Sequence, residues 1–493
     1  MLWALFLAAN VAGTLQAEKL ERGLGLKEAT ALNMIDMVGI GPFVVIPLVI
    51  KAMGGPQCLV AWAAGAVLAL LDGFVWSELG AAMPQAGGSY VFLREAYGPG
   101  RWGRLMSFLF IWQTMIQAPL VMASGAIGFA QYFSYLVPLG RYAQKAVSGA
   151  VIVVLVFLLY RRITTVGKIS LLLWAGVMGT IVWLIWGGVT HFDARLAFRY
   201  PAGAWDLSWL FFAGLGAATV NTIYTYWGYY NICHLGGEIK NPERNIPRGI
   251  FLSIAGITVL YLAMQTSILG VLPWQQAQNS PFIVSAFVER LYGKGAATLA
   301  TLLILWVAFA SLFSLILGYS RVPYAAAVDG NFFFVFGRVH PTKRFPHVSL
   351  LTLGAAGLVF SVAFNRLGTV IKAILAMRLL VQFIGQAIGV MILRRRWSSE
   401  RLPFKMWLYP LPAVATIFGW AALFLVTGYH EFSPWRIQFT LLGEPMHVVF
   451  PGGRIHFAVL GLGILLLGAL VFFVRARILK EWPFVRMRLG AGQ

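Results

Sequence analysis

Apolar runs recur along nearly the whole chain, and short polar segments separate them. Each run has roughly the 20 residues that an α-helix needs to cross the hydrocarbon core of a bilayer. The pattern predicts twelve spanning helices and leaves no room for a soluble domain. The predicted spans are 28–50, 56–82, 104–137, 142–160, 166–189, 207–236, 247–273, 293–325, 347–365, 369–393, 408–428 and 456–474.

The first span carries residues that do not suit an uninterrupted helix. Residues 33–47 read NMIDMVGIGPFVVIP, with two glycines (Gly39 and Gly41) directly before Pro42. Glycine favours non-helical backbone and proline removes a backbone donor, so the helix is expected to break there. Asp36 lies one turn before this break.

The sixth span is interrupted in a similar way. It contains Gly228 and has no strong helix former from Asn221 to Asn231. The first and sixth spans open two possible halves of five spans each, and paired interruptions at corresponding positions indicate a transporter binding site. The alternative is that these glycines only allow helices to pack closely.

Broken helices at membrane depth offer free backbone groups to a ligand. A half-helix that begins at a break presents N–H groups and a positive dipole end to an anion, and one that ends there presents carbonyls to a cation. Such irregular backbone is tolerated only where protein or a water-filled cavity surrounds it. A zwitterion suits this pair of breaks.

Composition supports the membrane assignment and excludes a nucleic-acid-binding protein. The chain is 59% hydrophobic and 11% charged, with mean hydropathy +0.77, whereas a soluble protein has about 25% charged residues. The net charge of +21 is spread over short loops. Lys and Arg number 24 on the side that holds both termini and 10 on the other. This bias predicts cytoplasmic termini in a cell-membrane protein.

Two terminal segments fall outside the predicted spans. Residues 1–17 are apolar but short, lack the basic start of a signal peptide, and are not counted as a span. The basic tail 475–493 is expected to contact anionic lipid.

Four stretches resemble the amino acid–polyamine–organocation permease superfamily. Two are long and specific matches to its cytoplasmic signatures, GFVWSELGAAMPQAGGSYVFLREAYGP (73–99) and GGEIKNPERNIPRGI (236–250). The other two look like the loop after span 8 (320–351) and the region before span 11 (395–413). The resemblance extends from about residue 25 to 475.

The resemblance implies an all-α, LeuT-like architecture with a five-plus-five inverted repeat and two further helices. The expected parts are a cytoplasmic segment 1–27, repeats 28–189 and 207–393, two helices in 408–474, and the tail 475–493. It also implies transport of amino acids or related amines by alternating access.

The resemblance further assigns residues to the substrate site. Its pattern at GIGPF implies that backbone N–H groups of Ile40 and Gly41, next to Gly39, bind the substrate carboxylate. Carbonyls of the second break are then expected to bind the amine, and an aromatic residue there covers the substrate. These residues are Tyr224, Thr225 and Trp227, with Tyr224 as the gate; the alternative for Tyr224 is ordinary packing.

The first break also departs from the family pattern, whose commoner form is Gly-Ser-Gly-Ile-Phe. Ile40 replaces the serine and removes a hydroxyl, and Pro42 removes an N–H. These changes leave open a polyamine or another organic cation that depends less on a carboxylate.

Lys168 at the start of span 5 matches a family lysine that takes the place of a sodium ion. The resemblance implies that it bridges the first break and span 8, near Ser311 or Ser314, and couples transport to protons. The alternative is a lysine that extends to water at a helix end.

Asp36 has three readings. It lies three residues before Gly39, on the same helical face, and could set substrate charge or carry a proton, pair with a cation such as Lys168, or face a hydrated vestibule. Arg378 lies deep in span 10 and should have a partner. Glu78 and Glu238, in the two signatures, are expected to form intracellular ion pairs.

The sequence therefore favours a secondary transporter, either proton-coupled or an exchanger, over two other classes. No HExxH pair, Gly-rich phosphate loop or GxSxG motif indicates an enzyme. No catalytic residue, cofactor or metal is expected. A nutrient sensor is the third class, and the sequence leaves a homo-oligomer open.

Overall fold

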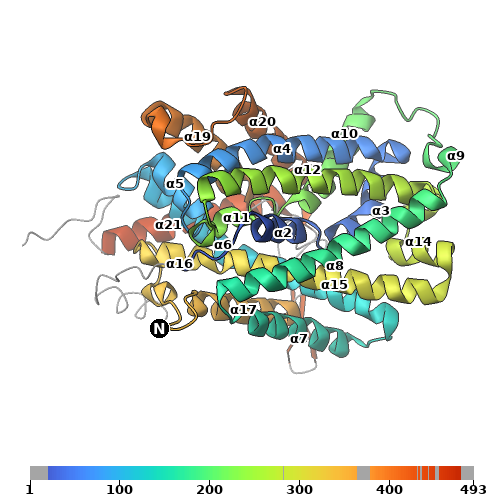
Figure 1. Cartoon of the computed structure of the whole chain (residues 1–493), viewed down its shortest axis with the longest axis horizontal. Coiled ribbons are helices and arrows are strands. Elements are labelled where there is room, and N and C mark those ends of the chain that lie inside the picture. Colours follow the sequence, from blue (N-terminus) through green and yellow to red (C-terminus); the bar gives the residue numbers. More distant parts are fainter. Residues whose placement is uncertain are drawn as a thin grey trace, which may run out of the picture.

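The computed structural model describes residues 20–280, 282–363, 378–429 and 455–478, and the short strands 431–432, 436–441 and 444–449. Nearly all of it is helical, and the long helices lie side by side along the long axis of the molecule (Figure 1). This confirms the predicted α-helical class of a multi-pass membrane protein.

Eight of the predicted spans coincide with helices long and apolar enough to cross a membrane, counted over the described residues. The first joins the short helix η1 to α4, and another joins α15 to α16. The bounds are η1 Pro56–Cys58 with α4 Leu59–Ala82, α6 Trp102–Leu136, α7 Arg141–Leu159, α8 Ile163–Thr190, α12 Pro242–Leu269, α15 Lys294–Tyr319 with α16 Arg321–Val328, α20 Leu411–Tyr429 and α21 Phe457–Ile478.

The predicted first span is two helices with a bend of 46° between them. Helix α2 (Leu26–Met37) ends before the two glycines, and α3 (Gly41–Met53) begins at the second. Pro42 lies in the first turn of α3, where its missing N–H would have had no intrahelical acceptor. The expected break is therefore confirmed.

Three other predicted spans have no described helix that passes as a membrane span by length and composition, and two of them run into residues outside the described ranges. Helices α10 (Trp209–Tyr226) and α17 (His347–Ala363) occupy two of them. The third contains the π-helix η4 (Leu379–Ile384) and α19 (Gly385–Arg396), while its first part lies outside the described residues. The count of twelve spans and the inverted repeat stay predictions.

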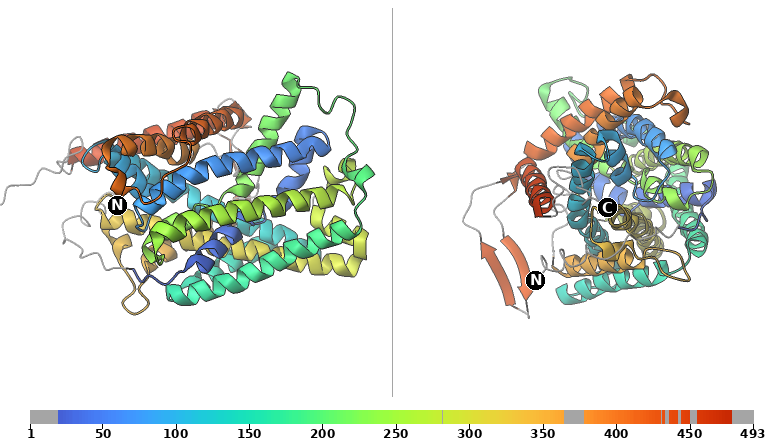
Figure 2. Two further views of the ribbon diagram at one scale, coloured as in Figure 1. Left: turned by 45° about the horizontal axis from the view of Figure 1, so that its top comes forward. Right: turned by 90° about the vertical axis from the view of Figure 1, so that its left-hand side faces the viewer.

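Short helices gather at the two ends of the molecule. One end has α5 (Ser89–Tyr97), α16 and the start of the α19–α20 connection, and the other has α9 (Ala194–Ala197) and α14 (Ile283–Tyr292) (Figures 1 and 2). The remaining short elements are α11 Asn231–His234, η2 Gly236–Glu238, α13 Trp274–Ala277, η3 Phe334–Gly337 and η5 Ser399–Arg401.

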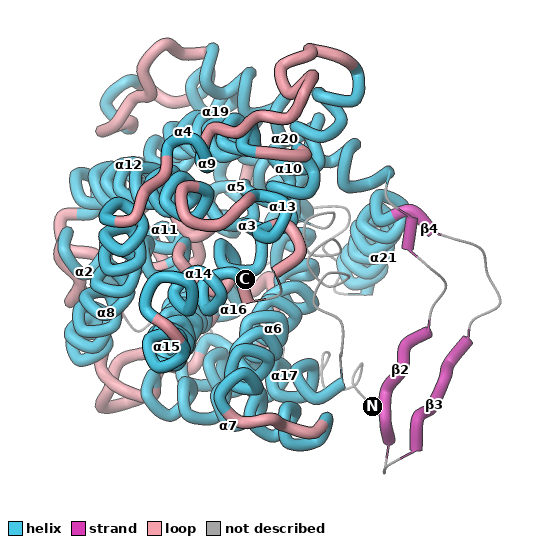
Figure 3. Tube along the Cα trace, turned by 90° about the vertical axis from the view of Figure 1, so that its right-hand side faces the viewer, coloured by secondary structure: helices cyan, strands magenta, loops and turns pink. Residues whose placement is uncertain are grey.

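The connection between α20 and α21 contains strands that the sequence pattern did not predict. Strands β2 (Arg436–Leu441) and β3 (Glu444–Val449) form an antiparallel hairpin, with Arg436 opposite Val449. Strands β1 (Glu431–Phe432) and β4 (Ile455–His456) pair antiparallel beside the start of α21. The hairpin lies beside the helical bundle (Figure 3).

Two buried ion pairs lie at the end that holds α5 and α16. Glu238 pairs with Arg321 at 2.7 Å, and both side chains are almost fully buried. Glu78 pairs with Arg394 at 2.6 Å and also accepts the backbone N–H of Met406 at 2.8 Å. The expected ion pairs of the two signature segments are confirmed.

Candidate functional site

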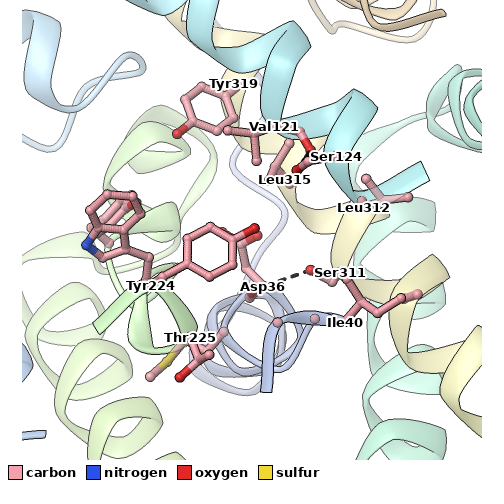
Figure 4. Close-up of a pocket in the computed structure, with 18 of the residues that line it drawn as sticks. Asp36, Ile40, Val121, Ser124, Tyr224, Thr225, Ser311, Leu312, Leu315 and Tyr319 are labelled. Carbon is pink, nitrogen blue, oxygen red and sulfur yellow. Dashed lines mark hydrogen bonds between the residues drawn. The ribbon is translucent and has the colours of Figure 1, made fainter. Parts of the chain in front are cut away.

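One cavity brings the two predicted breaks together. All six predicted substrate-binding residues line it, with Asp36 and Ser311 (Figure 4). Helices α6 and α15 close its other sides. Further lining residues include Val121, Ser124, Leu312, Leu315, Tyr319 and Arg378.

The first break leaves backbone donors free at the cavity. The N–H of Val38 still bonds to the carbonyl of Met34 at 2.9 Å, so α2 remains hydrogen-bonded up to that residue. The N–H groups of Gly39, Ile40 and Gly41 have no acceptor among the described residues. They lie at the start of α3, where a helix attracts negative charge.

The second break leaves backbone acceptors free at the same cavity. Helix α10 ends at Tyr226, and four residues separate it from α11. The carbonyls of Tyr224 and Trp227 accept no hydrogen bond from the described residues. This end of α10 therefore suits a cationic group.

The two breaks touch each other at Gly228. Its φ is +120°, a conformation that side chains disfavour. A Cβ atom on Gly228 would lie 2.7 Å from the backbone nitrogen of Met37 and 2.8 Å from the carbonyl carbon of Asp36. Glycine at this position therefore allows the backbone of the second break to rest on that of the first.

Two polar side chains fasten the breaks to each other. The hydroxyl of Tyr261, on α12, lies 2.7 Å from the carbonyl oxygen of Met37 and 3.1 Å from that of Thr225. The amide of Asn33, on α2, donates to the carbonyl of Tyr229 and accepts from the N–H of Ile232 at 3.0 Å. These four backbone groups at the breaks are thus hydrogen-bonded inside the protein, as burial requires, while the groups at the cavity stay free.

Helix α15 holds the first break from the opposite side. The hydroxyl of Ser311 donates to the carbonyl of Asp36 at 3.4 Å, and that of Ser314 donates to the carbonyl of Leu32 at 2.7 Å. Ser314 in turn accepts from the side-chain amide of Asn231 at 2.7 Å. Ser311 lines the cavity, whereas Ser314 fixes α2 and α11 behind it.

The structure does not show the expected bridge from Lys168, which stays a prediction. Lys168 lies on the exposed face of α8 and makes no hydrogen bond or ion pair with any described residue. The face of α8 toward α2 includes Gly167, whose Cβ would meet Leu24 and Glu28. One residue turns a helix by 100°, so Lys168 projects away from this contact.

Arg378, which the sequence places deep in its span and for which a partner is expected, lines the cavity. Its side chain is 3% exposed. Nε donates to Oε1 of Gln382 at 2.9 Å, and the guanidinium lies over the ring of Trp227 at 4.7 Å. Asp36 lines the same cavity, half-buried, and its carboxylate makes no hydrogen bond or ion pair with the described residues.

Sequence reasoning missed the residues that join distant segments. Asn33, Tyr261 and Tyr319 looked like ordinary polar and aromatic residues of spanning helices. The sequence could have indicated that Asn33 and Tyr261 form hydrogen bonds between helices, because a polar side chain at membrane depth needs a partner. The sequence gives no means of naming that partner 199 residues away.

Comparisons with known proteins agree with this geometry. The sequence profile described as "Amino acid permease" matches residues 24–443, which is most of the chain. The chain belongs to this amino acid permease family. Proteins that it is similar to are named as exchangers, transporters and permeases.

Three relatives of this permease show how varied the family is. The serine/threonine exchanger of Bacillus subtilis is 25% identical over 81% of this chain and 90% of its own. The methylthioribose transporter of the same organism is 25% identical over 79% of this chain and 86% of its own. Human cationic amino acid transporter 4 is 26% identical over 68% of this permease, but the match spans only 54% of the human protein.

Proposed function

We propose that this permease is a secondary active transporter that moves amino acids across the cell membrane by alternating access, either coupled to protons or by exchange. The carrying observation is that one cavity is lined both by residues with free N–H groups at the first break and by residues with free carbonyls at the second. An α-amino acid has a carboxylate for the start of α3 and an ammonium for the end of α10.

The names of the relatives support an amino acid as cargo. Serine and threonine or cationic amino acids are the substrates named for two of them. A polyamine fits the cavity less well, because the guanidinium of Arg378 lines it and repels a second cationic group. Within this proposal Tyr224 covers the bound substrate, and both termini are cytoplasmic.

The test is uptake by the purified permease in proteoliposomes. Radiolabelled amino acids and polyamines are offered with and without a pH gradient, and with and without unlabelled amino acid inside. Proton coupling predicts uptake driven by the gradient, whereas exchange predicts uptake that requires internal substrate. Polyamine uptake without amino acid uptake would overturn the proposal.

A glycine variant tests the position of the site. A Cβ on Gly41 would lie 3.4 Å from both Tyr224 and Thr225, so the longer side chain of Gly41→Leu enters the cavity. We expect this variant to bind substrate at least about tenfold more weakly, since overpacking costs about 1–3 kcal/mol. Gly140→Leu is the control, because a Cβ there meets no atom within 4 Å. Unchanged affinity in Gly41→Leu would place the site elsewhere.

A further inference from the structure

Among the described residues, no carboxylate lies within ion-pair distance of the buried guanidinium of Arg378, and Asp36 interacts with it only at longer range. Its Nη2 atom is buried and has no hydrogen-bond acceptor, and no described carboxylate forms an ion pair with it. A charge that is taken out of water and left unpaired is strongly unfavourable in a membrane protein. Arg378 also lines the substrate cavity, so a ligand bound there would lie next to this buried donor.

Aromatic rings surround this guanidinium without neutralising it. Besides Trp227, its central carbon lies 5.3 Å from the ring centre of Tyr230 and 5.7 Å from that of Tyr319. Rings at these distances attract a cation, but the interaction is weaker than an ion pair with a carboxylate. The rings hold Arg378 in place and exclude water, which increases the need for a negative charge from the ligand.

Asp36 supplies the opposite charge in the same cavity without pairing with Arg378. No contact within 4.0 Å joins their charged groups, and Asp36 has no other cationic partner among the described residues. When the ends of the broken helices are counted as well, the cavity has two groups that attract an anion, the start of α3 and Arg378. It has two for cations, Asp36 and the end of α10.

We propose that Arg378 binds a second carboxylate of the substrate, and that this permease carries acidic amino acids. The inference rests on the proposed function and narrows its substrate class. In such a complex the α-carboxylate lies at the N–H groups of Ile40 and Gly41, and the ammonium lies between Asp36 and the carbonyls of α10. The side-chain carboxylate accepts hydrogen bonds from Arg378, which lines the same cavity.

This charge pattern discriminates between amino acid classes. A neutral amino acid leaves Nη2 of Arg378 buried and unpaired, so its binding carries a desolvation cost that an acidic amino acid avoids. A basic amino acid brings a second cation toward the guanidinium. Glutamate and aspartate are therefore expected to bind more tightly than serine, leucine or arginine.

The experiment measures both binding and uptake in the purified permease. Glutamate, aspartate, serine, leucine and arginine are compared by ligand-induced thermal stabilisation and by radiolabelled uptake in proteoliposomes. The wild type is compared with Arg378→Gln, Arg378→Lys and the control Arg141→Gln, which removes an exposed cation at the start of α7. We expect Arg378→Gln to weaken glutamate binding by roughly tenfold or more, since a lost charged hydrogen bond has an effect of this size.

Serine binding should change far less in Arg378→Gln, and Arg378→Lys should keep part of the glutamate affinity because it keeps the charge. Stronger binding of serine, leucine or arginine than of glutamate by the wild type would overturn the inference while leaving amino acid transport intact. Transport of no amino acid at all would overturn the proposed function itself.

A purely structural role for Arg378 gives a different result. If Arg378 only balances the charge of Asp36, Arg378→Gln weakens all five amino acids equally, and the double variant with Asp36→Asn restores glutamate binding. That outcome would contradict the inference. If Arg378 binds the substrate, the double variant still binds glutamate weakly while its affinity for the other amino acids changes little. Thermal unfolding without ligand identifies any variant that does not fold.

Discussion

At the residue scale, a single hydroxyl joins the two halves of the site. Tyr261 is fully buried, and its oxygen lies within hydrogen-bonding distance of the carbonyls of Met37 and Thr225, one at the end of each broken helix. The hydroxyl has one proton for these two acceptors. Its position therefore holds both helix ends at a fixed separation without fully satisfying either.

Tyr261→Phe removes this shared donor and keeps the ring. We expect a loss of about 1–2 kcal/mol in stability, because two buried carbonyls lose their donor. We also expect a higher KM, because the breaks are no longer held together. Tyr132→Phe is a matched control, since the buried hydroxyl of Tyr132 has no hydrogen-bond partner. Equal effects of the two substitutions on thermal unfolding and uptake would show that the hydroxyl of Tyr261 has no special role.

Gly228 is the residue at which the backbones of the breaks meet. Gly228→Ala places a methyl group 2.7 Å from the nitrogen of Met37 at a positive φ, so the breaks must separate or the residue must change conformation. We expect a loss of at least about 1 kcal/mol in stability and a loss of substrate-induced thermal stabilisation. Gly179→Ala is the control, because a Cβ on that residue of α8 meets no atom within 4 Å. Retained substrate binding in Gly228→Ala would contradict this contact.

At the element scale, two kinds of ion pair hold the helices at one end of the bundle. Arg321 on α16 and Glu238 on η2 are 2% and 0% exposed, whereas Arg94 on α5 and its partner Asp329 are 17% and 30% exposed. A buried charge that loses its partner has no water to replace it. The first pair should therefore matter much more than the second.

Arg321→Ala leaves Glu238 buried and unpaired, and we expect it to lower stability by about 3–5 kcal/mol. Arg94→Ala should cost at most about 1 kcal/mol, since water reaches both partners of the Arg94–Asp329 pair. Thermal unfolding of the purified variants measures the difference. The double variant Arg321→Met with Glu238→Leu should recover much of the loss, and a double variant as unstable as Arg321→Ala would contradict the ion-pair explanation.

Local sequence predicted the broken helices, because Gly39, Gly41 and Pro42 act on their own backbone. The ion pairs of Glu78 and Glu238 were expected from the place of these residues in the two signature segments, not from local sequence. The exposure of Lys168 could not be foreseen, because adjacent residues of a helix point 100° apart and only the packing of α8 on α2 decides which one faces inward. The partners of Asn33 and Tyr261 depend on tertiary contacts that no local pattern encodes.

At the scale of the whole molecule, the distribution of Lys and Arg predicts which end faces the cytoplasm. The end with α5 and the α19–α20 connection contains Arg94, Arg394 and their neighbours, and the end with α9 and α14 has fewer cations. The positive-inside rule therefore places the ion-paired end in the cytoplasm. The same rule places the β2–β3 hairpin outside, because it follows α20.

Cysteine labelling tests this orientation. Both native cysteines are buried and free, so an impermeant maleimide should report only an introduced exposed cysteine. We expect Ser398→Cys to react only when the cytoplasmic face is open to the reagent, and Ala202→Cys, at the opposite end, to react on intact cells. The reverse pattern would invert the topology.

The unpaired guanidinium of Arg378 also affects the turnover cycle. If the permease works by the proposed alternating access, an empty carrier must pass through its closed state with this charge buried and no carboxylate within ion-pair distance, whereas a loaded carrier has the carboxylate of its substrate there. The empty return step should therefore be the slow one. A permease built in this way exchanges one substrate for another faster than it accumulates either, so internal glutamate should accelerate the entry of external glutamate.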